Sequence, residues 1–334
     1  MRILVAGANG YLGGRVSEYL AAQGNEIVAL VHHRPTEVNE WLNKMSRVVE
    51  GDARDKDVLL SAMEGKVDCV VFTISLDHRM SGKEPFTTLA INVGILWTLL
   101  EIYAEKGGGR LIYLSTQQVY GKQNAGEVIR EEGPLLPANP YGLTHKYCED
   151  LCSFYSQERG LNCISLRLSN SFGAPVFPTC NCWWLVINDF CKTALEQGRL
   201  RLLSDGSSQR DFIPISDICR VIEMVVTLPV SALLHGQYNL SGGKTYTILE
   251  LAHEVANICA DRYGKKFPVV LPDGKVSHDA RHHHDISRFT YDISRLRELG
   301  FAPSCDLRCG IEEVLDFLVK SSYPAIYTHA STGK

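Results

Sequence analysis

A hydroxyl and a phenol occupy two motifs of this chain from which both could act on the same atom. The first motif, Ser115-Thr116-Gln117-Gln118-Val119-Tyr120-Gly121, follows an apolar run, Arg110 to Leu114, that is typical of a β-strand. The second motif, Asn139-Pro140-Tyr141-Gly142, opens a helical pattern. We predict that Thr116 faces Tyr141. Near a dinucleotide, such a pair could move a proton while a hydride moves between carbon atoms.

The N-terminus predicts the dinucleotide site. Ile3 to Ala6 has the composition of a strand, a helix is predicted from Arg15 to Gln23, and Glu26 to Val31 reads as a second strand. A glycine motif at the first turn of such a βαβ unit lets the backbone approach a pyrophosphate at a helix N-terminus. The residues expected to bind the cofactor there are Gly7, Asn9, Gly10, Tyr11, Leu12 and Gly13.

The end of the second predicted strand bears on which nicotinamide cofactor is bound. An Asp or Glu there would accept a hydrogen bond from the 2′-hydroxyl of NAD, but the chain has Val31-His32-His33-Arg34. Arg34, helped by His32 or His33, could face a 2′-phosphate instead. The cofactor is therefore expected to be NADP or NAD, with NADP slightly favoured. Asp52, followed by Ala53 after the third predicted strand, could accept from the adenine amino group.

The order of the predicted elements indicates an α/β protein with two parts. We predict a Rossmann-type, doubly wound parallel sheet formed by residues 1–170, with residues 212–240 returning to it. A smaller, mixed α/β substrate lobe is expected from residues 171–211 and 241–322, where the regular α/β alternation breaks up. Residues 323–334 are expected to form a loose tail.

Composition limits the class of partner and the compartment. The 334 residues are 45% hydrophobic and carry a net charge of -4, which gives no basic surface for nucleic acid. No secretory signal is seen before the glycine motif, so the 11 cysteines are expected to be reduced thiols of a cytoplasmic protein. The apolar runs of the sequence are judged too short to predict a membrane span.

The motifs together resemble the extended short-chain dehydrogenase/reductase superfamily, in the branch of NAD(P)-dependent epimerases, dehydratases and reductases that act on nucleotide sugars. The resemblance runs from Arg2 to about Leu318. It rests on the glycine motif, Asp52, Asn92, the Ser115-Thr116 pair before Val119-Tyr120-Gly121, Pro140-Tyr141-Gly142, Asn170, Arg210-Asp211-Phe212 and Asp292-Ile293-Ser294-Arg295.

The resemblance implies roles for single residues. Thr116 would bond the reacting hydroxyl or carbonyl, and Tyr141 would be the acid/base. Asn170 and Arg210 would hold the nucleotide diphosphate, Arg210 through charge-assisted hydrogen bonds. The resemblance also implies that Asn92 contacts the cofactor and that the substrate is contacted by Gln117, His282 and Asp285. His282 stands where the family usually has an Arg.

The chain departs from the family at the catalytic lysine. The family pattern is Tyr-x-x-x-Lys, whereas Tyr141 is followed four residues later by His145 and five later by Lys146. Residues i and i+4 share one helix face, so we predict His145 beside Tyr141, contacting cofactor and, when protonated, favouring tyrosinate. The alternative is a one-residue slip that restores Lys146.

Gln117 and Gln118 stand where dehydratases of the family have an acid pair. Amides cannot exchange protons usefully, which argues against 4,6-dehydration. Redox at a sugar carbon remains, as 4-epimerisation with a retained cofactor or as net reduction or oxidation at C4. A non-catalytic NAD(P)-binding sensor or scaffold is the alternative of another class.

Two further expectations concern metals and self-association. The run His282-His283-His284 cannot converge on one ion from a helix or strand, so no metal site is predicted. Predicted helices at Thr87–Glu105 and Thr144–Glu158 resemble the dimer surface of the family, and a homodimer is expected.

Overall fold

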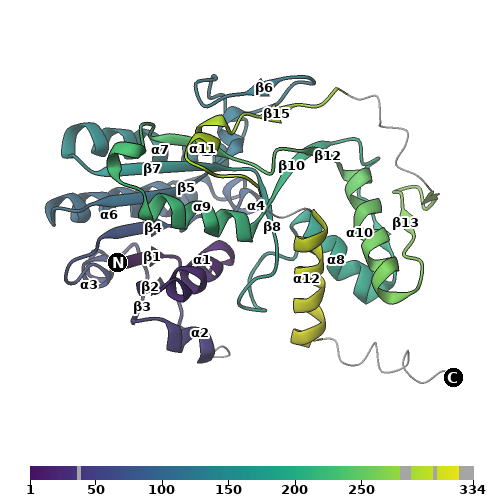
Figure 1. Cartoon of the computed structure of the whole chain (residues 1–334), viewed down its shortest axis with the longest axis horizontal. Helices are drawn as coiled ribbons and strands as arrows, with labels where there is room; N and C mark the ends of the chain where they lie inside the picture. Colours follow the sequence, from purple (N-terminus) through teal and green to yellow (C-terminus); the bar gives the residue numbers. More distant parts are fainter. Residues whose placement is uncertain (36–38, 279–286, 304–306, 323–334) are drawn as a thin grey trace.

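The computed structural model describes residues 1–35, 39–278, 287–303 and 307–322. A parallel sheet of seven strands lies at its centre, in the order β11-β7-β5-β4-β1-β2-β3 (Figure 1). The strands are β1 (Arg2–Ala6), β2 (Glu26–Val31), β3 (Arg47–Glu50), β4 (Cys69–Phe72), β5 (Arg110–Thr116), β7 (Asn162–Leu168) and β11 (Gln237–Leu240). The predicted Rossmann-type α/β fold is confirmed.

Alternate side chains of each central strand pack into two different hydrophobic layers. In β1, Ile3 and Val5 belong to one buried cluster, while Leu4 and Ala6 belong to the other. Successive side chains of a strand point to opposite faces, and a parallel sheet is covered on both. One face is covered by α1 (Tyr11–Ala22), α2 (Asn39–Lys44), α9 (Ile215–Thr227) and α11 (Ser294–Glu298), and the other by α3 (Lys56–Ala62), α6 (Ile95–Glu105) and α7 (Pro140–Arg159).

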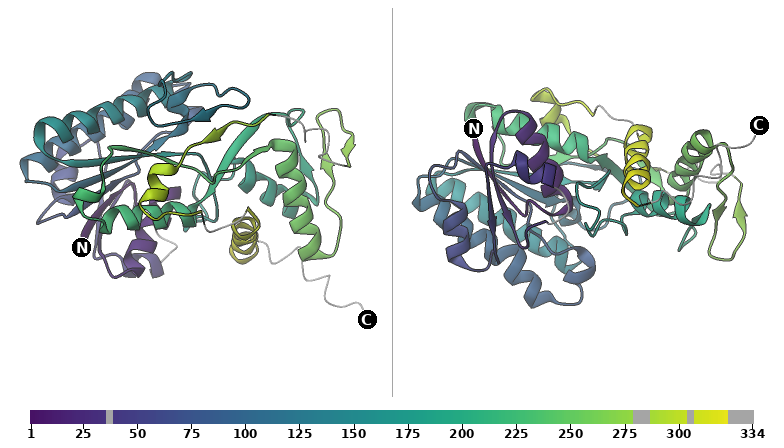
Figure 2. Two further views of the ribbon diagram at one scale, coloured as in Figure 1. Left: turned by 45° about the horizontal axis from the view of Figure 1, so that its top comes forward. Right: turned by 90° about the horizontal axis from the view of Figure 1, so that it is seen from below.

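The second part of the molecule is a smaller lobe with its own core. Its helices are α8 (Val186–Gln197), α10 (Ile248–Tyr263) and α12 (Leu307–Ser322), which pack together beyond the edge of the large sheet (Figures 1 and 2). Two small sheets accompany them: β8 (Asn170–Phe172) with β10 (Gln209–Pro214) and β12 (Thr245–Thr247), and β9 (Leu200–Arg201) with β13 (Val269–Val270) and β14 (Val276–Ser277). A third pair, β6 (Val128–Ile129) with β15 (Thr290–Tyr291), lies beside β11 of the large sheet, where Asn239 Nδ2 donates to the Ile129 carbonyl at 3.2 Å.

Two segments assigned to the lobe from the sequence contact the larger core instead. Phe177, Cys180 and Cys182 pack with α1 and the strands, and so do Ile293 and Leu296 near the C-terminal end of the fold. The chain thus leaves the large sheet near residues 170 and 240, but some residues beyond these boundaries still pack in the core of the larger part.

Several predicted elements differ at their ends. α1 begins at Tyr11, four residues before the predicted Arg15, because Gly10 is already its N-cap. β4 spans four residues rather than the expected Val67 to Ile74. The helix predicted from Thr87 begins with α5 (Pro85–Thr88) and runs through a π-helical turn, η1 (Leu89–Gly94), into α6.

Within the described residues, Pro85–Glu105 is long and apolar enough by length and composition to cross a bilayer, so the expectation that no such run exists was wrong. However, half of the most apolar stretch of this segment is buried inside the protein. A core helix of a soluble fold has the same properties, because it must pack one face on the sheet.

The ten cysteines in the described ranges are all free thiols, and nine of them are buried. The expectation of reduced cysteines therefore agrees with their placement. In the same ranges, no group of three or more His, Cys, Asp or Glu side chains is arranged to hold a metal ion.

Candidate functional site

Thr116 and Tyr141 are brought together at the carboxyl end of β5. Thr116 is the last residue of β5 and caps the short 3-10 helix η2 (Gln117–Tyr120), its Oγ1 accepting from Gln118 N at 3.2 Å. Tyr141 is the second residue of α7, whose N-cap is Asn139, with Oδ1 accepting from Gly142 N at 2.8 Å. The end of β5 and the start of α7 thus place the hydroxyls of Thr116 and Tyr141 at the same edge of the sheet.

The two motifs also bind each other directly. Asn139 Nδ2 donates to Gln118 Oε1 at 2.9 Å. The backbone of Gly142 approaches so closely that an added Cβ would lie 2.6 Å from the carbonyl oxygen of Gln118. Glycine is therefore required after Tyr141, and Gln118 joins the motifs.

A cavity of about 600 Å³ opens beside these residues, between the large sheet and the lobe. Thr116, Gln117 and Tyr141 line it from one side, and Asn170 and Arg210 line it from the lobe strands β8 and β10. Four residues predicted to bind substrate, together with the proposed acid/base, therefore face one space. This is the volume of a site for a small organic molecule.

Gln117 is buried, and neither its amide oxygen nor its amide nitrogen has a hydrogen-bond partner in the described part of the chain. Burying an amide without a partner is unfavourable, so a polar group entering the cavity would find a donor and an acceptor there. The placement agrees with the predicted contact to substrate.

Burial controls the acid–base state of Tyr141. The pKa of the Tyr141 phenol is raised to about 12, mainly by burial and also by the Asp77 carboxylate, while the hydrogen bond with the Thr116 hydroxyl lowers it. The phenol is consequently protonated at neutral pH. Asp77, the N-cap of α4 (His78–Ser81), was not identified from the sequence, because only the fold brings it near Tyr141.

His145 lies beside Tyr141, with ring centroids 4.4 Å apart in an edge-to-face arrangement. Lys146 instead points along the outer face of α7 and pairs with Asp150, at 2.9 Å between Nζ and Oδ2. The structure therefore contradicts the slipped register that would restore Lys146 to the lysine position.

Burial opposes a positive charge on His145. The side chain is buried, and burial lowers the pKa of its imidazole to about 3. Its two ring nitrogens contact Tyr113 Oη at 2.6 Å and Ser75 Oγ at 3.2 Å. His145 was expected to favour tyrosinate only when protonated, and with this pKa its imidazole is neutral near pH 7.

The glycine loop fits a dinucleotide. A Cβ at Gly13 would lie 2.1 Å from the carbonyl oxygen of Gly7, and Gly7 has φ of +87°, which side chains rarely adopt. Gly10 caps α1 without any side-chain hydrogen bond to the helix. The first N–H groups of α1 are thus available for the pyrophosphate of a bound cofactor.

Other residues of the predicted cofactor site have structural contacts. Asn9 Nδ2 donates to the His33 carbonyl at 2.9 Å, which ties the loop to the end of β2. Tyr11 Oη donates to the Gly173 carbonyl at 3.0 Å, which ties the start of α1 to the segment after β8. Leu12 packs against the core and Ala53 is buried.

Asn92, also predicted to contact the cofactor, is buried between two segments. It is 1% exposed, its Oδ1 accepts from Leu76 N at 2.8 Å, and its Nδ2 donates to Thr144 Oγ1 at 3.1 Å. Asn92 therefore joins the loop after β4 to α7.

The ends of β2 and β3, where the adenosine ribose is expected, are followed by the basic side chains His32, Arg34 and Arg54. His32 and Arg34 are exposed after β2. Arg54 binds Asp52 through Nε, 3.0 Å from both carboxylate oxygens, and lowers the pKa of that carboxyl to about 2. Asp52 is therefore ionised and already paired, which leaves Arg34 as the candidate reader of a 2′-phosphate.

We expect Arg34→Ala to weaken binding of NADP(H) about ten- to a hundredfold, because one charged hydrogen bond contributes roughly 1.5–3 kcal/mol. Binding of NAD(H) should change little. Calorimetric titration of both cofactors into wild type and variant measures this. Equal or tighter binding of NAD(H) by the wild-type protein would contradict the expected preference.

Arg210→Ala is expected to weaken binding of a nucleoside diphosphate about ten- to a hundredfold, for the same reason. Arg210 lines the cavity opposite Tyr141 and is exposed, so its removal should not destabilise the fold. Calorimetry with the nucleoside diphosphate, and with the cofactor as control ligand, checks it. Unchanged diphosphate binding would assign Arg210 a structural role.

His282 and Asp285 lie outside the described residues.

Comparison with known proteins shows what the chain is similar to. Residues 3–241 match the NAD dependent epimerase/dehydratase family. The low-salt glycan biosynthesis protein Agl12 of Haloferax volcanii is 26% identical over 326 residues, covering 95% of this chain and 98% of the relative. A dTDP-glucose 4,6-dehydratase of Streptomyces niveus is 26% identical over 340 residues, covering 95% and 92%.

A similar solved structure is the UDP-glucose 4-epimerase of Thermus thermophilus in complex with NAD. It is 25% identical in sequence, has a TM-score of 0.79, and the similarity covers 96% of this chain and 100% of that one.

Proposed function

Because the chain belongs to the NAD dependent epimerase/dehydratase family, we propose that it transfers hydride at C4 of a nucleoside-diphosphate sugar. The family prediction made from the motifs is confirmed, and with it the class of enzyme. The observation that carries the finer proposal is the shared cavity, in which Thr116 and Tyr141 face Asn170 and Arg210. A sugar at the first pair and a diphosphate at the second would occupy it together.

The chain's own side chains supply the proton chemistry. A nicotinamide cofactor, when bound, supplies or accepts the hydride. Tyr141 gives a proton to the sugar oxygen or takes one from it, and the Thr116 hydroxyl polarises that oxygen. Gln117 offers a hydrogen-bonding amide but no acid or base, which supports redox chemistry over elimination of water.

Net reduction of a 4-keto sugar is the direction that the site favours. Tyr141 is a protonated phenol, and its neighbour His145 is neutral, so the imidazole provides no charge to stabilise tyrosinate. A protonated phenol can give its proton to a carbonyl oxygen that receives hydride. The 4-keto substrate would come from a preceding dehydration or oxidation of a nucleotide sugar.

Epimerisation at C4 with a retained cofactor is the second candidate. The likeness to a UDP-glucose 4-epimerase in complex with NAD favours it. It requires oxidation as well as reduction, so Tyr141 must also act as a base. A non-catalytic binding protein would show ligand binding without either reaction.

The experiment offers purified protein NADH or NADPH with uridine- and thymidine-linked 4-keto sugars, and, separately, UDP-glucose with NAD. If the absorbance of the reduced cofactor is lost at the same rate as the keto sugar is consumed, the result supports net reduction. Interconversion of UDP-glucose and UDP-galactose without loss of cofactor supports epimerisation. Binding of both ligands without turnover would contradict both enzymatic proposals.

A cytoplasmic homodimer remains part of the proposal. Apolar side chains on the outer surface of α6 and α7 support self-association, since Trp97, Leu143, Tyr147 and Phe154 are all exposed there. Grouped exposed apolar residues are typical of association surfaces.

A further inference from the structure

The loop after β4 connects the glycine loop to the catalytic helix. β1 and β4 are neighbours in the sheet, although β2 and β3 separate them in sequence. Such a topological switch point is where parallel α/β sheets bind dinucleotides. A Cβ added to Gly7 would lie 2.7 Å from Thr73 Oγ1 and 3.2 Å from Ile74 Cγ1, so this loop packs directly on the glycine loop.

Ser75, the next residue of this loop, is exposed and reaches His145. Ser75 Oγ lies 3.2 Å from His145 Nε2 and donates to the Leu76 carbonyl at 3.0 Å. A serine hydroxyl has one proton and two lone pairs. Since its proton is directed to Leu76, Ser75 accepts from Nε2–H, and one lone pair remains for a ligand.

The contact on the other side of the imidazole agrees with this arrangement. With the proton on Nε2, His145 Nδ1 is an acceptor, and the buried Tyr113 phenol donates to it at 2.6 Å. The direction of hydrogen bonding therefore runs from Tyr113 through His145 to Ser75. Each ring nitrogen has a partner, and the imidazole needs no second proton.

The backbone next to Ser75 is held as well. Leu76 N donates to Asn92 Oδ1 at 2.8 Å, and Asn92 Nδ2 donates to Thr144 Oγ1, adjacent to His145. Asn92 belongs to the π-helical turn η1, a geometry that often marks functional positions. Ser75 is thus an exposed hydroxyl held in place from both the side chain and the backbone.

We propose that Ser75, oriented by His145, accepts a hydrogen bond from the ribose on the nicotinamide side of the bound dinucleotide. The inference rests on the proposed dinucleotide chemistry. Ser75 lies between the loop that fits the pyrophosphate and the Tyr141–His145 pair, where that ribose must pass. Ser75, held by His145, then supplies a hydrogen bond to the ribose without adding a charge to the site.

Three ligands that differ by single parts test this proposal. ADP lacks the second ribose, ADP-ribose contains it, and NAD(P)H adds the nicotinamide. Calorimetry should show that Ser75→Ala lowers the affinity for ADP-ribose and for NAD(P)H about two- to tenfold, which is the effect of one neutral hydrogen bond. The affinity for ADP should not change. Ser75→Thr, which keeps the hydroxyl, should bind like wild type. Ser231→Ala, at an exposed serine of the turn η3 (Val230–Ala232), is the matched control.

Unchanged affinity of Ser75→Ala for all three ligands would overturn the proposal. An equal loss for ADP and ADP-ribose would also overturn it, because the effect would then not arise at the second ribose. Failure of the wild-type protein to bind any of the three would instead contradict the proposed function. Thermal unfolding of each variant verifies that the fold is intact.

Discussion

Tyr141→Phe is expected to lower turnover of the nucleotide sugar by about 10²- to 10⁴-fold, the usual contribution of a general acid or base. Affinity for the cofactor should stay the same, because the phenol acts on the sugar oxygen. Initial rates and calorimetric binding on the same preparations measure both. Lys146→Ala is the matched control: its amine pairs with Asp150 on the outer face of α7, so its loss should have little effect.

The pH dependence of the two reaction directions should differ. Because the pKa of Tyr141 is raised to about 12, the proton donor needed for reduction is present throughout the neutral range, and Tyr141 should cause no fall in the reductive rate there. Oxidation needs tyrosinate, whose fraction rises about tenfold per pH unit below the pKa. The oxidative rate should therefore increase steadily with pH.

His145→Lys should shift the oxidative profile towards lower pH. A lysine at that position would place a positive charge beside Tyr141, which favours tyrosinate and lowers the phenol pKa. We expect oxidative activity to be retained or raised. Rate against pH for this variant and for Lys146→Ala provides the test. A crippled Lys146→Ala together with a mild His145→Ala would contradict the placement of the two residues.

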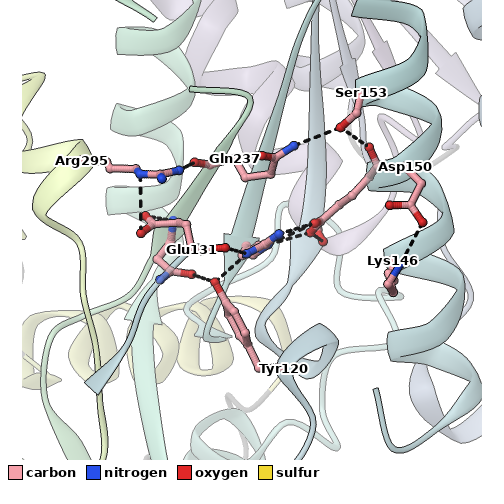
Figure 3. A network of polar contacts seen from close by, with 11 residues as sticks. Tyr120, Glu131, Lys146, Asp150, Ser153, Gln237 and Arg295 are labelled. Carbon is pink, nitrogen blue, oxygen red and sulfur yellow. Dashed lines mark hydrogen bonds and ion pairs between the residues drawn. The ribbon is translucent and has the colours of Figure 1, made fainter. Parts of the chain in front are cut away.

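Glu149→Gln is expected to lower the free energy of unfolding by about 3–5 kcal/mol, because it leaves a buried guanidinium without its counter-charge. Arg167 Nη2 lies 2.7 Å from Glu149 Oε2, and only 4% and 3% of the two side chains are exposed. Arg167 also donates to Tyr120 Oη at 2.7 Å and to the Glu131 carbonyl at 2.9 Å. Figure 3 shows this network between α7 and the strands.

Urea denaturation of wild type and variants measures this loss. Asp150→Asn, one residue further along α7, is the control. Its pair with Lys146 lies on the surface, with 60% of the Asp150 side chain exposed, so its removal should cost less than about 1 kcal/mol. Similar stability of the two variants would show that the buried pair adds nothing beyond a surface pair.

The same ion pair links stability to the site. Ser115 Oγ donates to Glu149 Oε1 at 2.5 Å, and Ser115 precedes Thr116 in β5. Glu149 follows His145 by one helical turn. The carboxylate thus holds the strand end and the helix that carry the two reacting hydroxyls, and a destabilised variant should lose activity on warming before wild type does.

The sequence by itself determined the local features of this protein. The glycine motif predicted the dinucleotide loop because only glycine permits the close approach at Gly13 and the φ at Gly7. Short apolar runs predicted the buried parallel strands. The spacing of Tyr141 and His145 predicted that they share a helix face, since i and i+4 contacts depend only on helix geometry.

The tertiary structure decided the charge at the site. His145 is neutral because burial by the fold lowers the pKa of its imidazole, and Tyr113 and Ser75, 32 and 70 residues away along the chain, contact its two nitrogens. Asn92 turns inward because the loop after β4 and α7 meet around it. Desolvation and hydrogen bonding depend on which distant segments pack together, and no spacing within a motif encodes that.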